Sequence, residues 1–189
     1  MQNSIVLSDC VRLAETFYTV RSENIVAKDD GGKLRGLSQN QICIGVATDK
    51  QNTLFLVEGT GQPTRNRTLE TFCKHIKPGA ILIHDEEKAR AKLVEELSLD
   101  SGAYSSKNLK CLTDKDNPLN PANRRHDILK KFLNARGSFD RDKLQGYLKL
   151  FAFVANPPVE MLEKVERVIQ MAFENPKLRR YRDFYGANT

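Results

Sequence analysis

Hydrophobic and polar positions in the first third of the chain predict β-strands. Apolar and polar residues alternate loosely over 11–18 (VRLAETFY), and 41–47 (QICIGVA) and 53–57 (TLFLV) are rich in residues that suit a pleated sheet. The short polar segment 48–52 between the last two is typical of a hairpin connection. The pattern predicts three neighbouring antiparallel strands, with the glycine-rich segment 27–36 as a mobile surface excursion after the first.

The middle of the chain changes to a helical period and then to a buried strand. Apolar residues over 69–76 fall at helical spacing before Pro78 and Gly79, which predicts a helix that ends there. Residues 80–83 (AILI) are continuously apolar, as in a strand covered on both faces, and an apolar stripe over 86–97 predicts another helix. The predicted order is three antiparallel strands, a helix, a central strand and a helix.

The second half of the chain is predominantly helical. Apolar residues define one helical face in each of the segments 121–133, 144–151 and 162–173, and a pair of prolines separates the last two. The chain has 189 residues, of which 40% are apolar, and this suffices for one packed domain. We expect this domain over residues 1–156, with a helical extension and basic tail over 157–189 that packs on it.

The charge of the chain favours an acidic partner. The formal net charge is +6, and eight basic residues but three acidic ones lie between positions 121 and 149. The basic residues of segment 121–133 are Arg124, Arg125, Lys130 and Lys131. Contact with nucleic-acid phosphates and a merely solvated helix face explain this pattern equally well.

Cysteine usage and the lack of a long apolar run bear on the compartment. Cysteines stand at positions 10, 43, 73 and 111, with no C-x-x-C pair and no matching histidine spacing, so we expect four buried thiols in a reducing compartment. The longest apolar run is far shorter than the roughly 20 residues of a membrane span, and the first ten residues lack a secretory leader. We therefore expect a cytoplasmic protein with no membrane partner.

Two residues could carry chemistry. Asp85 follows the buried strand, at the end where open α/β sheets place ligands and metals, although an aspartate there can also serve as the N-cap of the next helix. His126 falls at the edge of the apolar face of segment 121–133. It could point toward a metal, or it could be a half-buried histidine that packs and forms one hydrogen bond.

Six segments carry a resemblance to a known family. They are VRLAETFY (11–18), KLRGLSQNQ (33–41), ILIHD (81–85), DKDNPLNP (114–121), NRRHDILKKF (123–132) and LQGYLKLFAFVANP (144–157). In this order and spacing they resemble the catalytic domain of bacterial insertion-sequence transposases of the DDE type. The resemblance implies an RNase H-like α/β fold: a mixed five-stranded sheet of three antiparallel strands and then parallel ones, with helices on both faces and a helical extension. The zinc-ribbon and helix-turn-helix region that precedes this domain in the family has no counterpart among the six segments.

The resemblance also implies a chemistry. In the family, three side chains hold two divalent ions, usually Mg²⁺ or else Mn²⁺, which cleave DNA and transfer the strand. By position Asp85 is the second of these ligands and His126 the third, with Asn123 in its place if the register is displaced by one helical turn. The implied partners are the DNA of the transposon ends and of the target, with a homodimer possible on DNA.

The first ligand position departs from the family's pattern. Relatives have aspartate and then glutamate where this chain has Ala14 and Glu15. A methyl group cannot bind a metal ion, and Glu15 is an imperfect substitute because consecutive strand residues point to opposite faces. We therefore expect an inactive or impaired catalytic core. The alternatives are a non-catalytic DNA-binding or regulatory protein derived from a transposase, and a nucleotide-binding α/β protein unrelated to transposition.

Overall fold

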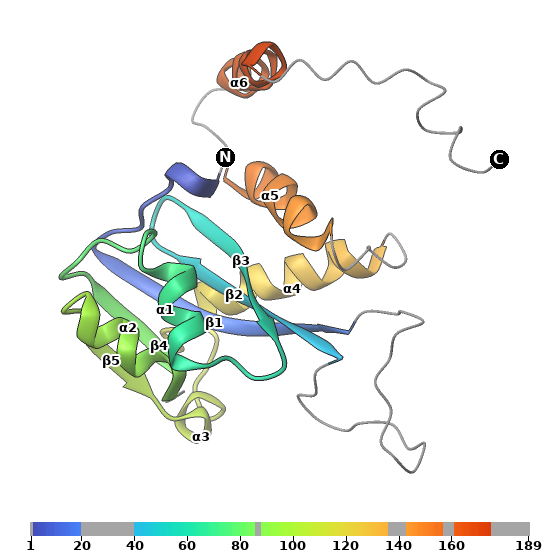
Figure 1. The fold of residues 1–189 in the computed structure, drawn as a ribbon. Helices are drawn as coiled ribbons and strands as arrows, with labels where there is room; N and C mark the ends of the chain where they lie inside the picture. Colours follow the sequence, from blue (N-terminus) through green and yellow to red (C-terminus); the bar gives the residue numbers. More distant parts are fainter. Residues whose placement is uncertain (1, 20–39, 86–87, 136–142, 157–160, 175–189) are drawn as a thin grey trace. The chain divides into compact units, whose positions relative to one another are not determined.

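The chain forms two compact units, Met1–Asn156 and Pro157–Thr189, and each is described by itself. A computed structural model describes residues 2–19, 40–85, 88–135, 143–156 and 161–174 (Figure 1). The predicted excursion at 27–36, most of segment 33–41 and the basic tail lie outside these residues.

A five-stranded sheet forms the centre of the first unit. Its strands are β1 (Cys10–Thr19), β2 (Gln41–Thr48), β3 (Thr53–Thr60), β4 (Ile81–Asp85) and β5 (Asp100–Tyr104), in the spatial order β3-β2-β1-β4-β5. The pairs β1–β2 and β2–β3 are antiparallel, whereas β4 runs parallel to both β1 and β5. The predicted α/β class with a mixed five-stranded sheet is confirmed, and the arrangement is consistent with an RNase H-like fold.

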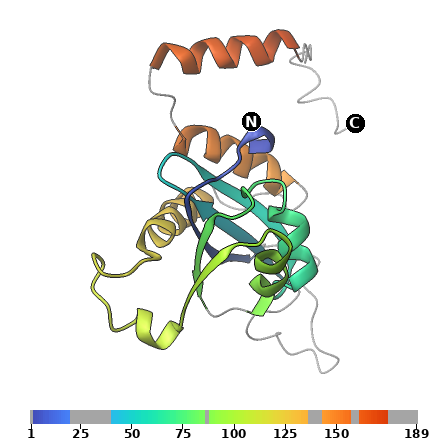
Figure 2. The same ribbon diagram turned by 90° about the vertical axis from the view of Figure 1, so that its left-hand side faces the viewer.

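Helices cover both faces of this sheet. The first unit contains η1 (Gln2–Ser4), α1 (Arg65–Phe72), η2 (Lys88–Arg90), α2 (Ala91–Glu96), α3 (Ser106–Leu109), α4 (Asn120–Ala135) and α5 (Leu144–Ala155), and the second contains α6 (Met161–Glu174). Figure 2 shows α1 and α2 on one side of the sheet and α4 and α5 on the other. The three helices predicted in the second half of the chain are confirmed as α4, α5 and α6.

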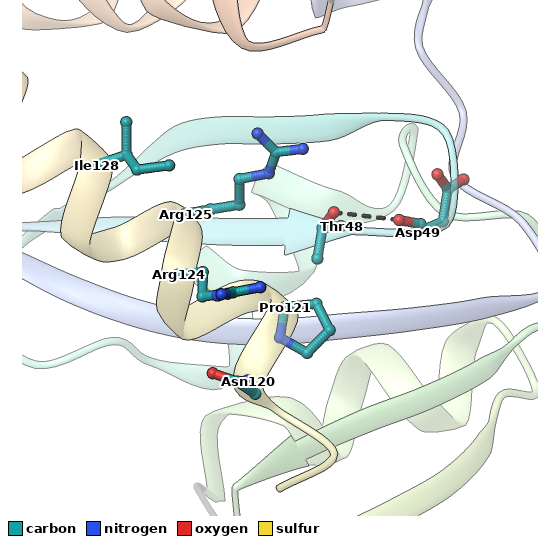
Figure 3. Close-up of a pocket in the computed structure, with 7 residues that line it drawn as sticks. All are labelled: Thr48, Asp49, Asn120, Pro121, Arg124, Arg125 and Ile128. Atoms are coloured by element: carbon teal, nitrogen blue, oxygen red, sulfur yellow. Dashed lines mark hydrogen bonds between the residues drawn. The ribbon is translucent and has the colours of Figure 1, made fainter. Parts of the chain in front are cut away.

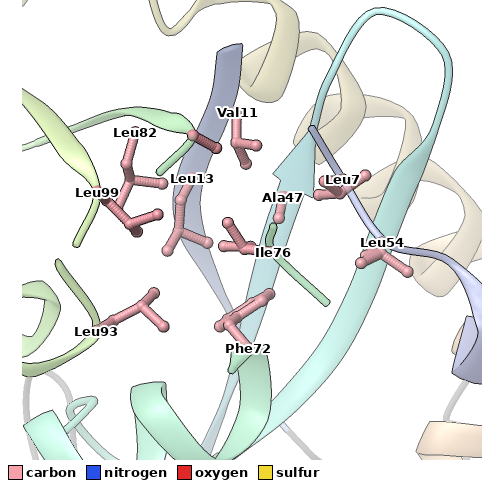
Figure 4. Close-up of a cluster of buried hydrophobic side chains, with 11 residues drawn as sticks. Leu7, Val11, Leu13, Ala47, Leu54, Phe72, Ile76, Leu82, Leu93 and Leu99 are labelled. Carbon is pink, nitrogen blue, oxygen red and sulfur yellow. The ribbon is translucent and has the colours of Figure 1, made fainter. Parts of the chain in front are cut away.

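Each face of the sheet has its own apolar core. The core on the α1 and α2 side contains Leu7, Val11, Leu13, Ala47, Leu54, Phe72, Ile76, Ala80, Leu82, Leu93 and Leu99 (Figure 4). The core on the α4 and α5 side contains Ile42, Ile44, Val46, Phe55, Leu129, Leu133, Leu144, Leu148, Phe151 and Ala152. Because side chains alternate along a strand, Leu13 belongs to the first face and its neighbour Ala14 to the second.

The helices on the α1 side are shorter than the sequence pattern predicts. α1 ends at Phe72 with Cys73 as its C-cap, and Ile76 instead forms an isolated parallel bridge with Leu7. The helix predicted over 86–97 is a 3-10 turn at 88–90 followed by α2, with residues 86 and 87 outside the described part. In both segments the apolar spacing predicts which residues are buried, but it overestimates the length of the helix.

Two other predictions were wrong, because Ile128 and three of the cysteines are more exposed than the sequence pattern suggests. The apolar face that the sequence predicts for segment 121–133 includes Ile128, but this residue is 49% exposed because α4 buries the narrower stripe of Ala122, His126, Leu129 and Leu133. Of the four cysteines only Cys43 is buried: Cys10 and Cys73 are half-buried and Cys111 is exposed, although all four are free thiols. Among the helices that the structure describes, none is long and apolar enough to cross a membrane.

Candidate functional site

The register of β1 and β4 places two of the expected site residues side by side. These strands are parallel and pair Arg12 with Ile83 and Leu13 with His84. Continued by one residue, the same register sets Ala14 beside Asp85, and paired residues of adjacent strands face the same side. Asp85 is the last residue of β4 and is half-buried, so it lies at the carboxyl end of the strand as predicted.

Asp85 is not the N-cap of α2. That helix begins at Ala91, and its N-cap position is Arg90. Instead, Oδ1 of Asp85 lies 3.6 Å from Nη2 of Arg90. The neighbouring His84 is fixed by contacts of its ring nitrogens with the Asp85 carbonyl and, at 2.9 Å, with the Ser101 hydroxyl.

His126 reaches the third corner of the same site. α4 packs over β1, and Nε2 of His126 donates a hydrogen bond of 3.3 Å to the carbonyl oxygen of Ala14. Burial lowers the pKa of His126 to about 4, although the bond to Ala14 works in the opposite direction. At neutral pH the ring is therefore uncharged, with its proton on Nε2 and its lone pair on Nδ1. His126 thus contacts Ala14 directly, and Asp85 lies beside Ala14 in the strand register and close enough to act electrostatically on His126.

Asn123 lies one turn before His126 and is half-buried. Within the described part of the chain its side chain forms no hydrogen bond, whereas His126 contacts Ala14 directly. This geometry favours His126 over Asn123 as the α4 residue of the site.

A cluster of buried charges, which sequence reasoning missed, lies on the opposite face of β1. Arg90 is 0% exposed and forms an ion pair with Glu15. Glu58 of β3 lies close enough to interact electrostatically with Arg90, and its Oε2 accepts a 2.7 Å hydrogen bond from the Thr68 hydroxyl. Glu15 is therefore held by Arg90 on the face away from His126, where it cannot replace a carboxylate at position 14.

The protonation of this cluster follows from its burial. Burial raises the pKa of Glu15 to about 7 even though Arg90 counteracts it, and burial likewise raises the pKa of Glu58. For Arg90 the burial works against the charged form, but the Glu15, Glu58 and Asp85 carboxylates outweigh it and raise its pKa. Arg90 is thus a permanent cation, shared between two buried carboxylates and the partly exposed Asp85.

Gly45 leaves room for the cluster. It pairs with Glu15 across β1 and β2, and a Cβ atom there would lie 2.5 Å from Oε1 of Glu58 and 2.6 Å from the ring of Phe72. A weak signal for the cluster exists in the sequence, because Glu58 continues the alternation of Leu54 and Leu56 toward a buried face. Nothing comparable marks Arg90.

The residues at the candidate site do not form a complete metal centre. Position 14 offers a methyl group, Asp85 lies beside the Arg90 guanidinium, and His126 uses Nε2 to bond a backbone carbonyl. Across the described ranges, no three His, Cys, Asp or Glu side chains are grouped so that they could hold a metal ion. One carboxylate and one neutral imidazole are too few ligands for two divalent ions.

Two pockets lie along α4, one on each side of His126. The α4-start pocket has a volume of about 540 Å³ and is lined by Thr48, Asp49, Asn120, Pro121, Arg124, Arg125 and Ile128 (Figure 3). The β1-end pocket has a volume of about 240 Å³ and is lined by Thr16, Phe17, Tyr18, Thr19, Lys130, Leu133 and Asn134. Three of the four basic residues singled out in the sequence therefore line a pocket, whereas Lys131 is exposed and lines neither.

The α4-start pocket contains two arginines and one aspartate. Arg124 and Arg125 form no ion pair with any residue in the described ranges. The carboxylate of Asp49 is already occupied, since it accepts hydrogen bonds from the backbone N–H groups of Ser8, Gln51 and Asn52. Two free guanidinium groups at the first turns of a helix are suited to an anion.

No family model matches the chain, and no curated protein matches it significantly.

Proposed function

We propose that this chain is the RNase H-like catalytic core of a DDE-type transposase that has lost efficient DNA cleavage through the alanine at position 14. The observation that supports this proposal is the meeting of Ala14, Asp85 and His126, which come from two adjacent parallel strands and one helix. These are the positions at which the resemblance in the sequence expects the three metal ligands. The same three elements would bring together a working set if position 14 were an aspartate.

The loss of activity follows from the donor set. Without a carboxylate at position 14, Asp85 is the acidic residue that remains of the three expected ligand positions, and its carboxylate lies 3.6 Å from the Arg90 guanidinium. A guanidinium ion there competes with a metal ion for the same carboxylate. The Ala14 methyl group cannot bind a cation, and His126 is bonded to the Ala14 carbonyl oxygen.

DNA is the proposed partner because of what flanks the site. Arg124 and Arg125 line the pocket on one side of His126, and Lys130 lines the pocket on the other. Positive charge on both flanks of one helix can contact successive phosphates of a DNA strand. The net charge of +6 agrees with such a partner.

Restoring the missing ligand tests this function. The substitution Ala14→Asp should produce nicking of supercoiled DNA with Mg²⁺ or Mn²⁺, at a rate on the order of 100-fold above that of the natural sequence. Ala14→Asn is the matched control, since it has nearly the same shape without the charge and should not nick. Adding Asp85→Ala to Ala14→Asp should abolish the recovered activity, and nicking that survives this second change would come from elsewhere.

A second function has support from one observation. His126 is bonded to the Ala14 carbonyl and Asp85 is paired with Arg90, so both remaining ligands already have partners within the protein. This favours a non-catalytic DNA-binding protein that keeps the scaffold. DNA binding by Ala14→Asp without any nicking would support this second function, whereas stabilisation by a mononucleotide without salt-dependent DNA binding would contradict both.

A further inference from the structure

The β1-end pocket continues the candidate site along the same two elements. Thr16 lies two residues after Ala14 on β1 and therefore faces the same side of the sheet. Lys130 lies four residues, about one helical turn, after His126 on α4. The pocket of about 240 Å³ that both residues line therefore lies next to the Ala14–His126 contact, toward the carboxyl ends of β1 and α4.

Thr16 contributes a polar group with no partner. The residue is 4% exposed, and its hydroxyl oxygen is buried without a hydrogen bond to any described residue. A buried hydroxyl that is not hydrogen-bonded costs free energy, and native structures rarely contain one without a reason. A ligand in the pocket that Thr16 lines would supply the missing partner.

Lys130 contributes a charge with no counter-ion. Within the described ranges Lys130 forms neither an ion pair nor a side-chain hydrogen bond, and none of the described residues that line the pocket is acidic. Its charge reaches the candidate site, where it acts to lower the pKa of His126. The side-chain amide of Asn134, one turn further along α4, adds another hydrogen-bonding group, and it has no partner among the described residues.

We propose that the β1-end pocket binds a phosphate group through the Lys130 ammonium, the Thr16 hydroxyl and the Asn134 amide. A cation and two neutral donors, with no carboxylate among the described lining residues, match a phosphate, which offers several strong acceptor oxygens and a negative charge. The inference rests on the proposed function, because a DNA strand that follows α4 past His126 would place a backbone phosphate here.

Binding of inorganic phosphate, followed by titration calorimetry or NMR, tests the pocket directly. Lys130→Ala should weaken phosphate binding roughly tenfold or more, since it removes a charge-assisted contact. The matched control is Lys131→Ala, which removes the same charge from the next residue of the same helix and should leave phosphate binding unchanged. Equal weakening by the two variants, or no phosphate binding by the natural sequence, would overturn the proposal.

Thr16→Val provides a second variant that does not depend on charge. It keeps the shape of the side chain and removes a hydroxyl that has no partner in the structure, so the variant should fold with a Tm equal to or above that of the natural sequence. Its affinity for phosphate should nevertheless fall several-fold. Unchanged phosphate affinity in Thr16→Val would show that the hydroxyl is not a ligand and would contradict the proposed site.

The source of the phosphate group is distinguished by a short single-stranded oligodeoxynucleotide. If the group belongs to DNA, Lys130→Ala and Thr16→Val weaken oligonucleotide binding as they weaken phosphate binding, whereas unchanged oligonucleotide binding identifies a free phosphate compound as the occupant. Nicking by Ala14→Asp is measured separately. Nicking without any phosphate binding overturns the pocket alone, and phosphate binding without nicking contradicts the catalytic proposal alone.

Discussion

At the scale of single residues, the two faces of β1 bury ionisable side chains in opposite charge states. On one face His126 is buried without charge and bonds the Ala14 carbonyl. On the other face Arg90 is buried with its charge and is balanced by Glu15 and Glu58. The free energy of unfolding therefore depends on both groups, and in different ways.

Removal of the Arg90 charge should be strongly destabilising. Arg90→Met leaves Glu15 and Glu58 buried without a counter-ion, and breaking a buried ion pair in this way costs about 3–5 kcal/mol. The double variant Arg90→Met with Glu15→Gln should recover part of this loss in urea unfolding. Asp85→Asn is the control, since Asp85 is half-buried and 3.6 Å from Arg90, and it should change the stability by less than about 1 kcal/mol. A double variant no more stable than Arg90→Met would contradict the pairing.

The lowered pKa of His126 should make the free energy of unfolding depend on pH. Its pKa is about 4 in the folded protein and about 6.5 when unfolded, so between these values the unfolded chain binds more protons. The free energy of unfolding should thus rise with pH through this window, by on the order of 3 kcal/mol from this group, and be fully present above pH 6.5.

Glu15 opposes this trend. Because its pKa is raised to about 7, the folded state holds the proton longer, and its contribution to stability is lost as pH rises from about 4.5 to 7. The two contributions are similar in size and opposite in sign, so together they should change the stability of the natural sequence little between pH 4.5 and 7. In urea unfolding over this range, the stability of His126→Gln should fall as pH rises and that of Glu15→Gln should rise. Two variants with the slope of the natural sequence would show that neither group is perturbed.

At the scale of elements, the pairing of β1, β2 and β3 depends on a glycine under Glu58. Gly45→Ala would place a Cβ atom within 2.6 Å of both Glu58 and Phe72, and overpacking of this kind costs about 1–3 kcal/mol. Gly146→Ala is the matched control: a Cβ atom there meets nothing within 4 Å, and alanine in α5 should stabilise by about 0.5–1 kcal/mol. Thermal unfolding of both variants would show whether the cluster constrains β2.

The elements differ in how well the sequence predicts them. β2, β3 and β4 carry continuous apolar runs because they are covered on both faces, and they were predicted close to their observed bounds. β5 (DSGAY) was not predicted by its own pattern, because this edge strand is exposed or half-exposed throughout and has no apolar period.

The residues of the candidate site also differ in how well the sequence predicts them. Asp85 and His126 could be found because one follows a buried strand and the other lies on the apolar stripe of a long helix. The alternation in β3 marks Glu58 as facing a buried side, but its pairing with Arg90 and Glu15 could not be predicted, because the three residues are distant in the chain and meet through the packing of η2 against the sheet. Ion pairs between distant segments leave no periodic signal.

At the scale of the whole molecule, the net charge of +6 favours a DNA partner, and the basic residues of α4 are the proposed contacts with its phosphates. DNA affinity should fall as salt rises, and replacing one phosphate-contacting arginine should reduce the slope of log K against log salt by about 0.7–0.9. Arg124→Ala and Arg125→Ala should each do so in fluorescence anisotropy titrations. Lys131→Ala, outside both pockets, should leave the slope as it is. An unchanged slope in the arginine variants would place the DNA on another surface.

The proposed function requires that position 14, Asp85 and His126 converge on one point. Mn²⁺ binding by Ala14→Asp, measured by electron paramagnetic resonance at pH 7, tests this without any need for activity. The account predicts that Ala14→Asp binds Mn²⁺ at least about tenfold more tightly than the natural sequence or Ala14→Asn, and that adding Asp85→Asn removes the gain. Equal Mn²⁺ affinity in Ala14→Asp with and without Asp85→Asn would contradict it.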